Sequence, residues 1–186
     1  MDLILIRHGE PDITVDDLSD PPLTELGHRQ AQATAEFLSS THLDAIYVSP
    51  QRRAQQTSVP LLGQRGVAPI TDERIAEWDY EHDSYVPPWI DDVMTREEAI
   101  ARFQAMQTPE FHARVAAGMR DIIVNNPSRV VAVVCHGGVI GSLLNDILQA
   151  DGRFGPNHAS ITRVSANRRG TRSVISYNEH HWIPTE

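Results

Sequence analysis

The sequence predicts a single-domain α/β protein of three layers, in which helices cover both faces of a mostly parallel sheet. Two short runs, residues 3–6 and 130–134, are apolar at every position, which is typical of central strands that are covered on both faces. Strand-like and helix-like segments alternate between and after these runs. The length of 186 residues is that of one domain, so we expect residues 1–186 to fold as one unit.

The remaining elements follow the first strand in a regular order. Thr24 is a candidate N-cap, and Leu26, Ala33 and Phe37 after it lie on one side of a helix. The polar turn of residues 167–170 separates two strand-like segments, which predicts a closing antiparallel pair. In chain order we expect a helix over 24–39, a strand over 44–48, a helix over 50–63, a short strand near 67–70, helices within 95–125, the strand at 130–134, a helix over 138–149, and strands over 158–166 and 172–178.

Residues 79–95 form the main irregular segment of the chain. They include Pro87, Pro88 and several acidic residues, and the prolines interrupt regular elements. Because this segment leads into the expected helices, we predict that the region of about 79–120 forms a cap or lid over a site.

The charge and composition exclude several classes of partner. The chain has 16 Lys and Arg residues against 25 Asp and Glu residues, which gives a net charge of -9. Such a protein repels nucleic acids and acidic membranes, so any anion that it binds must be met by a local pocket. No stretch reaches the roughly 20 apolar residues of a membrane helix, no signal peptide opens the chain, and the single cysteine fits a reducing compartment. We therefore expect a soluble, cytoplasmic monomer or homodimer that contacts neither nucleic acid nor membrane.

Each of the two central strands ends in a histidine that is followed by glycine. In an open α/β sheet the ligand crevice lies outside the carboxyl ends of the strands, so adjacent strands place His8 and His136 together. The glycines, Gly137 among them, allow a ligand to approach the backbone closely, and the helix that follows presents its positive end to an anion. Arg7 adds a fixed positive charge that suits phosphate oxygens. The two strand ends therefore predict an anion site.

Several motifs, in the right order along nearly the whole chain, resemble those of the histidine phosphatase superfamily, whose best-known branch is cofactor-dependent phosphoglycerate mutase. The Arg-His-Gly motif alone is a weak signal, but the pieces together are specific. They are Arg7-His8-Gly9-Glu10, Leu23-Thr24 with Gly27 and Gln30-Ala31, the Ser-x-x-x-Arg-Ala-x-x-Thr pattern of Ser49, Arg53, Ala54 and Thr57, then Ile75-Ala76-Glu77, Cys135-His136-Gly137-Gly138, and residues 157–162.

The resemblance implies a fold like that of phosphoglycerate mutase and a phosphatase that works through a phosphohistidine. It makes His8 the nucleophile that accepts the phosphoryl group. It assigns Arg7, Arg53 and His136 to the phosphate oxygens and to the charge of the transition state. It makes Glu77 the proton donor to the leaving oxygen, which later acts as the base toward water.

Some of these assignments rest on the motif register. Only one of the adjacent arginines should point inward, and the register selects Arg53 rather than Arg52. Thr14 stands where the mutase branch usually has an asparagine, and it is a candidate to bind a phosphate oxygen through a hydrogen bond. Four carboxylates compete for the role of the acid, and register alone favours Glu77 over Glu73, Asp79 and Glu81.

We predict a phosphatase that hydrolyses small phosphate monoesters, with a small phosphorylated metabolite as its partner and no cofactor. The alternatives are a mutase with the same intermediate and a catalytically silent module that only binds a phosphorylated ligand. Trp78 replaces the arginine that the mutase branch carries beside the acid, and acidic residues follow it, which favours hydrolysis. We expect no metal site, because a single cysteine cannot form a cysteine-based zinc site and no metal-ligand spacing connects His82, His180 and His181. Cys135 is interpreted as a small buried residue rather than a thiol nucleophile.

Overall fold

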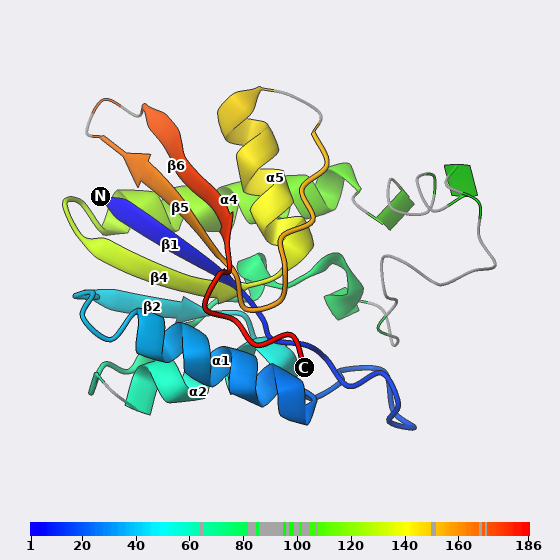
Figure 1. Ribbon diagram of the computed structural model, residues 1–186. Coiled ribbons are helices and arrows are strands. Elements are labelled where there is room, and N and C mark those ends of the chain that lie inside the picture. The colour runs from blue at the N-terminus through cyan, green and yellow to red at the C-terminus, as the bar shows by residue number, and fades with distance from the viewer. Residues whose placement is uncertain are drawn as a thin grey trace.

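The two apolar runs of the sequence form neighbouring strands at the centre of one sheet in the computed structural model (Figure 1). β1 (Asp2–Arg7) and β4 (Val130–Cys135) run parallel to each other. The order across the sheet is β3-β2-β4-β1-β5-β6, in which β5 is antiparallel to both of its neighbours and the other pairs are parallel. The remaining strands are β2 (Ala45–Val48), β3 (Pro69–Thr71), β5 (Ile161–Ala166) and β6 (Arg172–Glu179).

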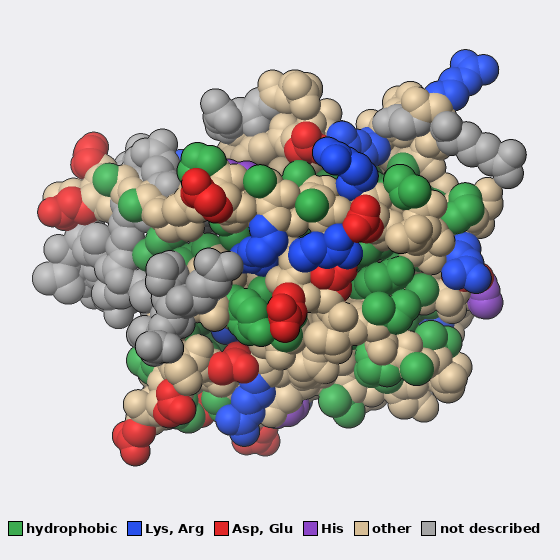
Figure 2. Space-filling model, turned by 180° about the vertical axis from the view of Figure 1, so that it is seen from behind, with side chains coloured by type: hydrophobic (Ala, Val, Ile, Leu, Met, Phe, Trp, Pro, Cys, Tyr) green, Lys and Arg blue, Asp and Glu red, His purple; other side chains and the backbone are tan. Residues whose placement is uncertain are grey.

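The structure describes most of the chain. The described residues are 1–63, 65–81, 85, 95, 97–98, 101, 105–106, 108–149, 152–167, 169 and 171–186. Among them, no helix is long and apolar enough to cross a membrane. On the face seen in Figure 2, arginine and acidic side chains are interspersed, so no large area of one charge forms there.

Alternate residues of β1 enter two separate cores, which explains why this run is apolar at every position. Leu3 and Leu5 pack in the core on the side of α4 (Pro109–Asn125) and α5 (Gly137–Leu148). Ile4 and Ile6 pack in the core on the side of α1 (Glu25–Phe37) and α2 (Arg52–Gly63). All four side chains are at most 2% exposed, and each contributes about 1.5–3 kcal/mol by burial. The predicted three-layer α/β class is therefore confirmed.

Residues near the C-terminus pack against α1. Thr24 caps this helix as predicted, because its side chain accepts a hydrogen bond from the Gly27 amide. Ala35 packs in the core under the sheet, and Phe37, from the apolar side seen in the sequence, packs against this core and stacks on Trp182 with the ring centroids 3.6 Å apart. The apolar residues of α1 therefore contact the end of the chain as well as the core under the sheet.

Two short 3-10 helices between β3 and α4 flank the predicted acid. They are η1 (Glu73–Ile75) and η2 (Trp78–Glu81), and Glu77 lies between them. Of the predicted cap region at 79–120, residues 82–84, 86–94, 96, 99–100, 102–104 and 107 lie outside the described residues, so the cap stays a prediction. From residue 109 onward this region belongs to α4, whose apolar face packs in the core beside the sheet.

Candidate active site

The carboxyl ends of β1 and β4 bring His8 and His136 together, as the strand pattern predicts. The register pairs Arg7 with Cys135, so the two histidines are the next residues along neighbouring strands. Their ring centroids lie 5.1 Å apart, and the side chains are 3% and 0% exposed. Both rings therefore line one buried site at the edge of the sheet.

Residues of α1 and α2 hold the loop that follows β1. The Gly9 amide donates to Thr57 Oγ1 on α2, and the Glu10 amide donates to Gln30 Oε1 on α1, both at 2.9 Å. A Cβ atom at position 9 would lie 2.5 Å from the carbonyl oxygen of Gly27, so this close approach of loop and helix requires glycine. The motif residues on the two helices thus fix the backbone beside the first histidine.

The hydrogen bond of His8 leaves one ring nitrogen free to react. His8 Nδ1 lies 2.7 Å from the Gly9 carbonyl oxygen, which can only accept, so Nδ1 carries the proton and Nε2 has a free lone pair. Burial lowers the pKa of His8 well below its ordinary value, and the charge of Arg53 acts in the same direction. His8 is therefore neutral at physiological pH and nucleophilic at Nε2.

Ser49, directly after β2, forms a hydrogen bond with His136. The Gln51 amide donates to Ser49 Oγ at 3.4 Å, and Ser49 Oγ lies 2.7 Å from His136 Nε2. The Ser49 hydroxyl can donate to Nε2, and in that arrangement the ring proton is on Nδ1, which has no partner among the residues that the structure describes. Burial, and then Arg53, lower the pKa of His136, so a neutral ring offers its Nδ1–H to a ligand.

Arg7 connects the end of β1 with the segment before β5. Its Nη1 donates to the Pro156 carbonyl oxygen, and its Nη2 lies 3.0 Å from His158 Nε2. Because a guanidinium can only donate, His158 accepts at Nε2, and burial followed by the charge of Arg7 lowers the pKa of His158 to about 3. The buried Arg7 Nε has no acceptor within the described ranges, so it remains available to an anion.

Arg53 is the inward-pointing member of its pair, as the motif register predicts. It is 0% exposed, whereas Arg52 is exposed. Its Nη2 donates to both carboxylate oxygens of Asp79 at 2.8 and 3.0 Å, and Gln51 Nε2 donates to Asp79 Oδ1 at 2.7 Å. Arg53 Nη1 is 3.8 Å from Asp20, but neither Nη1 nor Nε forms a hydrogen bond with a described residue. The buried ion pair therefore holds the guanidinium in place while two nitrogens stay available.

Glu77 reaches the same site from the side of the sheet on which α4 and α5 lie. Its Oε2 accepts from the Gly138 amide in the first turn of α5 at 2.8 Å, and its Oε1 accepts from the Trp78 amide at 3.2 Å. Burial, and then the charge of Asp79, raise the pKa of Glu77 to about 7. The carboxyl group is therefore partly protonated near neutral pH, which suits a group that donates and later accepts a proton.

The geometry joins an unprotonated histidine nitrogen to buried cationic donors and one protonatable carboxyl group. The family model of the histidine phosphatase superfamily (branch 1) matches residues 3–179. The chain belongs to this superfamily.

Individual relatives of this histidine phosphatase match nearly its whole length. Phosphoserine phosphatase 1 of Hydrogenobacter thermophilus is 28% identical over 192 residues, which cover 93% of this chain and 89% of that protein. The probable phosphoglycerate mutase GpmB of Yersinia pestis is 27% identical over 199 residues, which cover 98% of this chain and 88% of that protein. A solved structure of a phosphoserine phosphatase mutant from Entamoeba histolytica, in complex with phosphoserine, has a TM-score of 0.76 at 21% identity and covers 98% and 99% of the two chains. The predicted superfamily, fold and phosphatase class are thus confirmed.

Two residues predicted to bind the substrate make no hydrogen bond with the others. Thr14 is exposed, and its hydroxyl donates to Asp12 Oδ1 at 2.6 Å. Gly137 opens α5 beside Arg7, where an added Cβ would make an ordinary contact, 3.6 Å from Arg7 Nε. Their binding roles stay predictions.

Of the rival reactive groups, Asp79 is paired, Glu73 is exposed and Cys135 is buried and protonated, while the side chain of Glu81 lies outside what the structure describes. Both oxygens of Asp79 bind Arg53, and Glu73 is exposed. Burial raises the pKa of the Cys135 thiol, which keeps it protonated, in accord with the interpretation of Cys135 as a small buried residue. No cluster of three or more potential metal ligands is present in the part of the chain that is described.

Sequence reasoning missed two polar residues of this histidine phosphatase, and it considered Asp79 only as a rival acid. The ring centroids of His158 and His8 lie 5.5 Å apart. Gln51 forms hydrogen bonds with both the Asp79 carboxylate and the Glu77 amide. A signal for His158 exists: a strand that runs antiparallel beside β1 begins where β1 ends, so residues just before β5 belong to the same edge. Gln51 carries no such signal, because the Ser-x-x-x-Arg-Ala pattern specifies no residue at its position.

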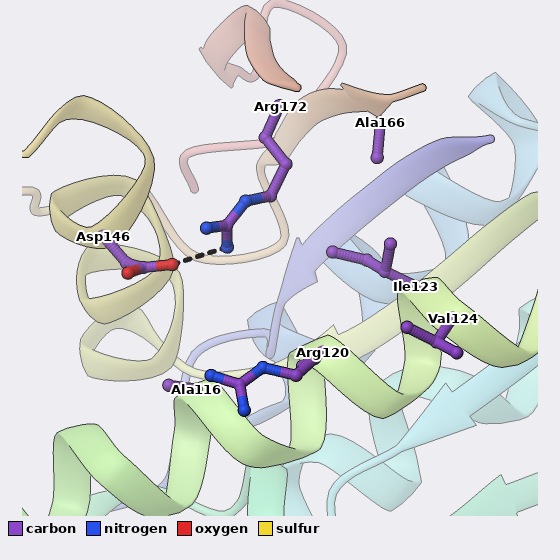
Figure 3. Close-up of a pocket in the computed structure, with 7 residues that line it drawn as sticks. All are labelled: Ala116, Arg120, Ile123, Val124, Asp146, Ala166 and Arg172. Carbon is purple, nitrogen blue, oxygen red and sulfur yellow. Dashed lines mark hydrogen bonds and ion pairs between the residues drawn. The ribbon is translucent and has the colours of Figure 1, made fainter. Parts of the chain in front are cut away.

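A separate hollow of about 240 Å³ lies between α4, α5 and the start of β6 (Figure 3). Arg172 pairs with Asp146 across it, and Arg120 extends from α4 along its wall. None of the site residues lines this hollow, so it is distinct from the active site.

Proposed function

We propose that the protein hydrolyses small phosphate monoesters through a phosphohistidine at His8, without a metal ion. Four buried donor atoms near His8 carry this proposal, because none has an acceptor in the described residues: Arg7 Nε, Arg53 Nε, Arg53 Nη1 and His136 Nδ1. A buried donor without a partner costs about 1–3 kcal/mol, so a group of four indicates a ligand that supplies the acceptors. The charged oxygens of a phosphoryl group match this requirement.

In the first step, Nε2 of His8 attacks phosphorus, so that an N–P bond forms while the bond from phosphorus to the ester oxygen breaks. The guanidinium groups of Arg7 and Arg53 and the His136 Nδ1–H bind the phosphoryl oxygens and stabilise their charge. Protonated Glu77 gives its proton to the leaving oxygen, which departs as an alcohol. The bond from His8 Nδ1 to the Gly9 carbonyl keeps the ring aligned throughout.

In the second step, water replaces the histidine on phosphorus. Ionised Glu77 takes a proton from the water as its oxygen bonds to phosphorus and the N–P bond breaks. Phosphate and neutral His8 are released, and Glu77 has recovered the proton that it lost in the first step. A pKa of about 7 allows one carboxyl group to serve both steps near neutral pH. A module that only binds phosphate has no need of such a group.

The relatives support a small phosphorylated metabolite as the substrate, since one is called a phosphoserine phosphatase. They also include a probable phosphoglycerate mutase, which keeps the mutase alternative in view. Of the acidic residues that favour hydrolysis in the sequence, Asp79 is paired with Arg53, so its charge repels a second anionic group less than the sequence implies. The argument for hydrolysis then rests on Trp78, which places an indole beside Glu77 where the mutase branch has an arginine.

Trapping the intermediate tests the proposal. After brief reaction with ³²P-labelled p-nitrophenyl phosphate and an alkaline quench, we expect one acid-labile, alkali-stable label on the wild-type protein and none on His8→Ala. The exposed His28 provides a matched control, and His28→Ala should be labelled like the wild type. Label on a serine or on Cys135 refutes the mechanism. Transfer of the label to phosphoglycerate faster than to water favours the mutase.

A further inference from the structure

Arg114 of α4 binds the backbone that carries the acid. We call residues 73–77 the acid loop. The Arg114 Nη1 lies 2.9, 3.1 and 3.2 Å from the carbonyl oxygens of Ala76, Glu73 and Arg74, and its Nη2 lies 3.3 Å from that of Glu77. One guanidinium is therefore within hydrogen-bond distance of four carbonyl groups, of which those of Glu73 and Glu77 also accept from the Ala76 and Tyr80 amides.

Few other contacts fix the backbone of Glu77. Its amide donates to Gln51 Oε1 at 2.7 Å, and its carbonyl oxygen accepts from the Tyr80 amide at 3.2 Å in addition to Arg114. The acid loop itself contains only the single turn of η1. Arg114 is thus the side chain that ties the backbone of Glu77 to the helix α4.

The close packing of α4 on the acid loop keeps Arg114 within reach. A Cβ atom at Gly118 would lie 2.8 Å from Arg74 Cβ, so only glycine permits this approach. Glycine within a helix lowers stability by about 0.5–1 kcal/mol relative to alanine, and the close contact between α4 and the acid loop offsets this cost. Near the next turn, Asp121 forms an ion pair with Arg74. The helix therefore meets the acid loop at residues 114, 118 and 121.

We propose that Arg114 is a positioning residue, which places the Glu77 carboxyl group against the leaving oxygen of the substrate. This inference rests on the proposed function of Glu77 as the general acid. Arg114 acts through the backbone of the acid loop, and a misplacement of about 1 Å at a reacting group can cost about 100-fold in rate. Arginine suits this role because its two terminal nitrogens reach acceptors on successive residues, whereas lysine offers one ammonium group.

The test compares two leaving groups. Arg114→Met keeps an unbranched apolar side chain but removes all donors, together with the guanidinium that lies over the Phe111 ring. We expect it to lower kcat/KM for glycerol 2-phosphate about 10- to 100-fold, and for p-nitrophenyl phosphate less than about threefold, because nitrophenolate leaves without a proton. The kcat/KM of Arg114→Lys for glycerol 2-phosphate should lie between the values of the wild type and Arg114→Met. Arg120→Met, on the same helix but beside the hollow of Figure 3, should leave both values unchanged.

A double variant separates positioning from folding. If Arg114 acts through Glu77, then adding Arg114→Met to Glu77→Gln costs no further activity on glycerol 2-phosphate. Equal losses on both substrates, or a full additional loss in the double variant, would overturn the proposal. Arg114→Lys carries the same comparison if Arg114→Met does not fold. If Glu77→Gln alone affects both substrates equally, the assignment of the acid fails instead.

Discussion

Replacing Glu77 by glutamine should stabilise the protein at pH 8 while it impairs catalysis. Burial raises the pKa of Glu77 from its ordinary 4.5 to about 7 in the folded state. The stability that this bound proton contributes is complete below pH 4.5 and is lost as the pH rises through 7. Relative to a side chain that never ionises, the buried carboxyl group lowers the free energy of unfolding by up to about 3 kcal/mol at pH 8 and by about 0.8 kcal/mol at pH 5.

Glutamine has nearly the same shape and can accept the same hydrogen bond from the Gly138 amide. The free energy of unfolding of Glu77→Gln should therefore exceed that of the wild type by about 3 kcal/mol at pH 8 and by less than about 1 kcal/mol at pH 5. Its kcat/KM for glycerol 2-phosphate should fall by about 10²- to 10⁴-fold.

Urea unfolding at both pH values, followed by the fluorescence of the three tryptophans, measures the effect on stability. The exposed Glu73 provides a control, because Glu73→Gln should change stability by the same small amount at pH 5 and pH 8. A difference for Glu77→Gln that does not depend on pH, or a loss of stability at pH 8, would refute the reasoning that burial holds the proton on Glu77.

Two further predictions concern the phosphate site. Ser49→Ala removes the hydroxyl that bonds to His136 Nε2 and so favours the proton on Nδ1, and we expect inhibition by vanadate to weaken about tenfold in a steady-state assay. Unchanged inhibition would contradict this use of Ser49 in binding the phosphoryl group through His136. We also expect prolonged treatment with EDTA to leave kcat unchanged, because Arg7 and Arg53 supply the charge that divalent ions provide in other phosphatases. Recovery of a lost activity on adding zinc or magnesium would contradict this expectation.

The sequence by itself determined the sheet and the edge at which the chemistry lies, because these depend on local properties. A run that is apolar at every position must be covered on both faces, and the order of strands and helices leaves few ways to connect them. The residues that follow two such strands then meet at one edge, which brings His8 and His136 together. The choice of Arg53 over Arg52 needed only the position of each residue in a motif that opens a helix.

The tertiary structure alone decided which distant groups surround these residues. His158 reaches the site because β5 runs antiparallel to β1, and Asp79 pairs with Arg53 across a gap of 26 residues in the chain. Arg114 binds the acid loop only because α4 packs on it at Gly118. The raised pKa of Glu77 likewise follows from burial, which depends on every segment packed around a group rather than on its neighbours in the sequence.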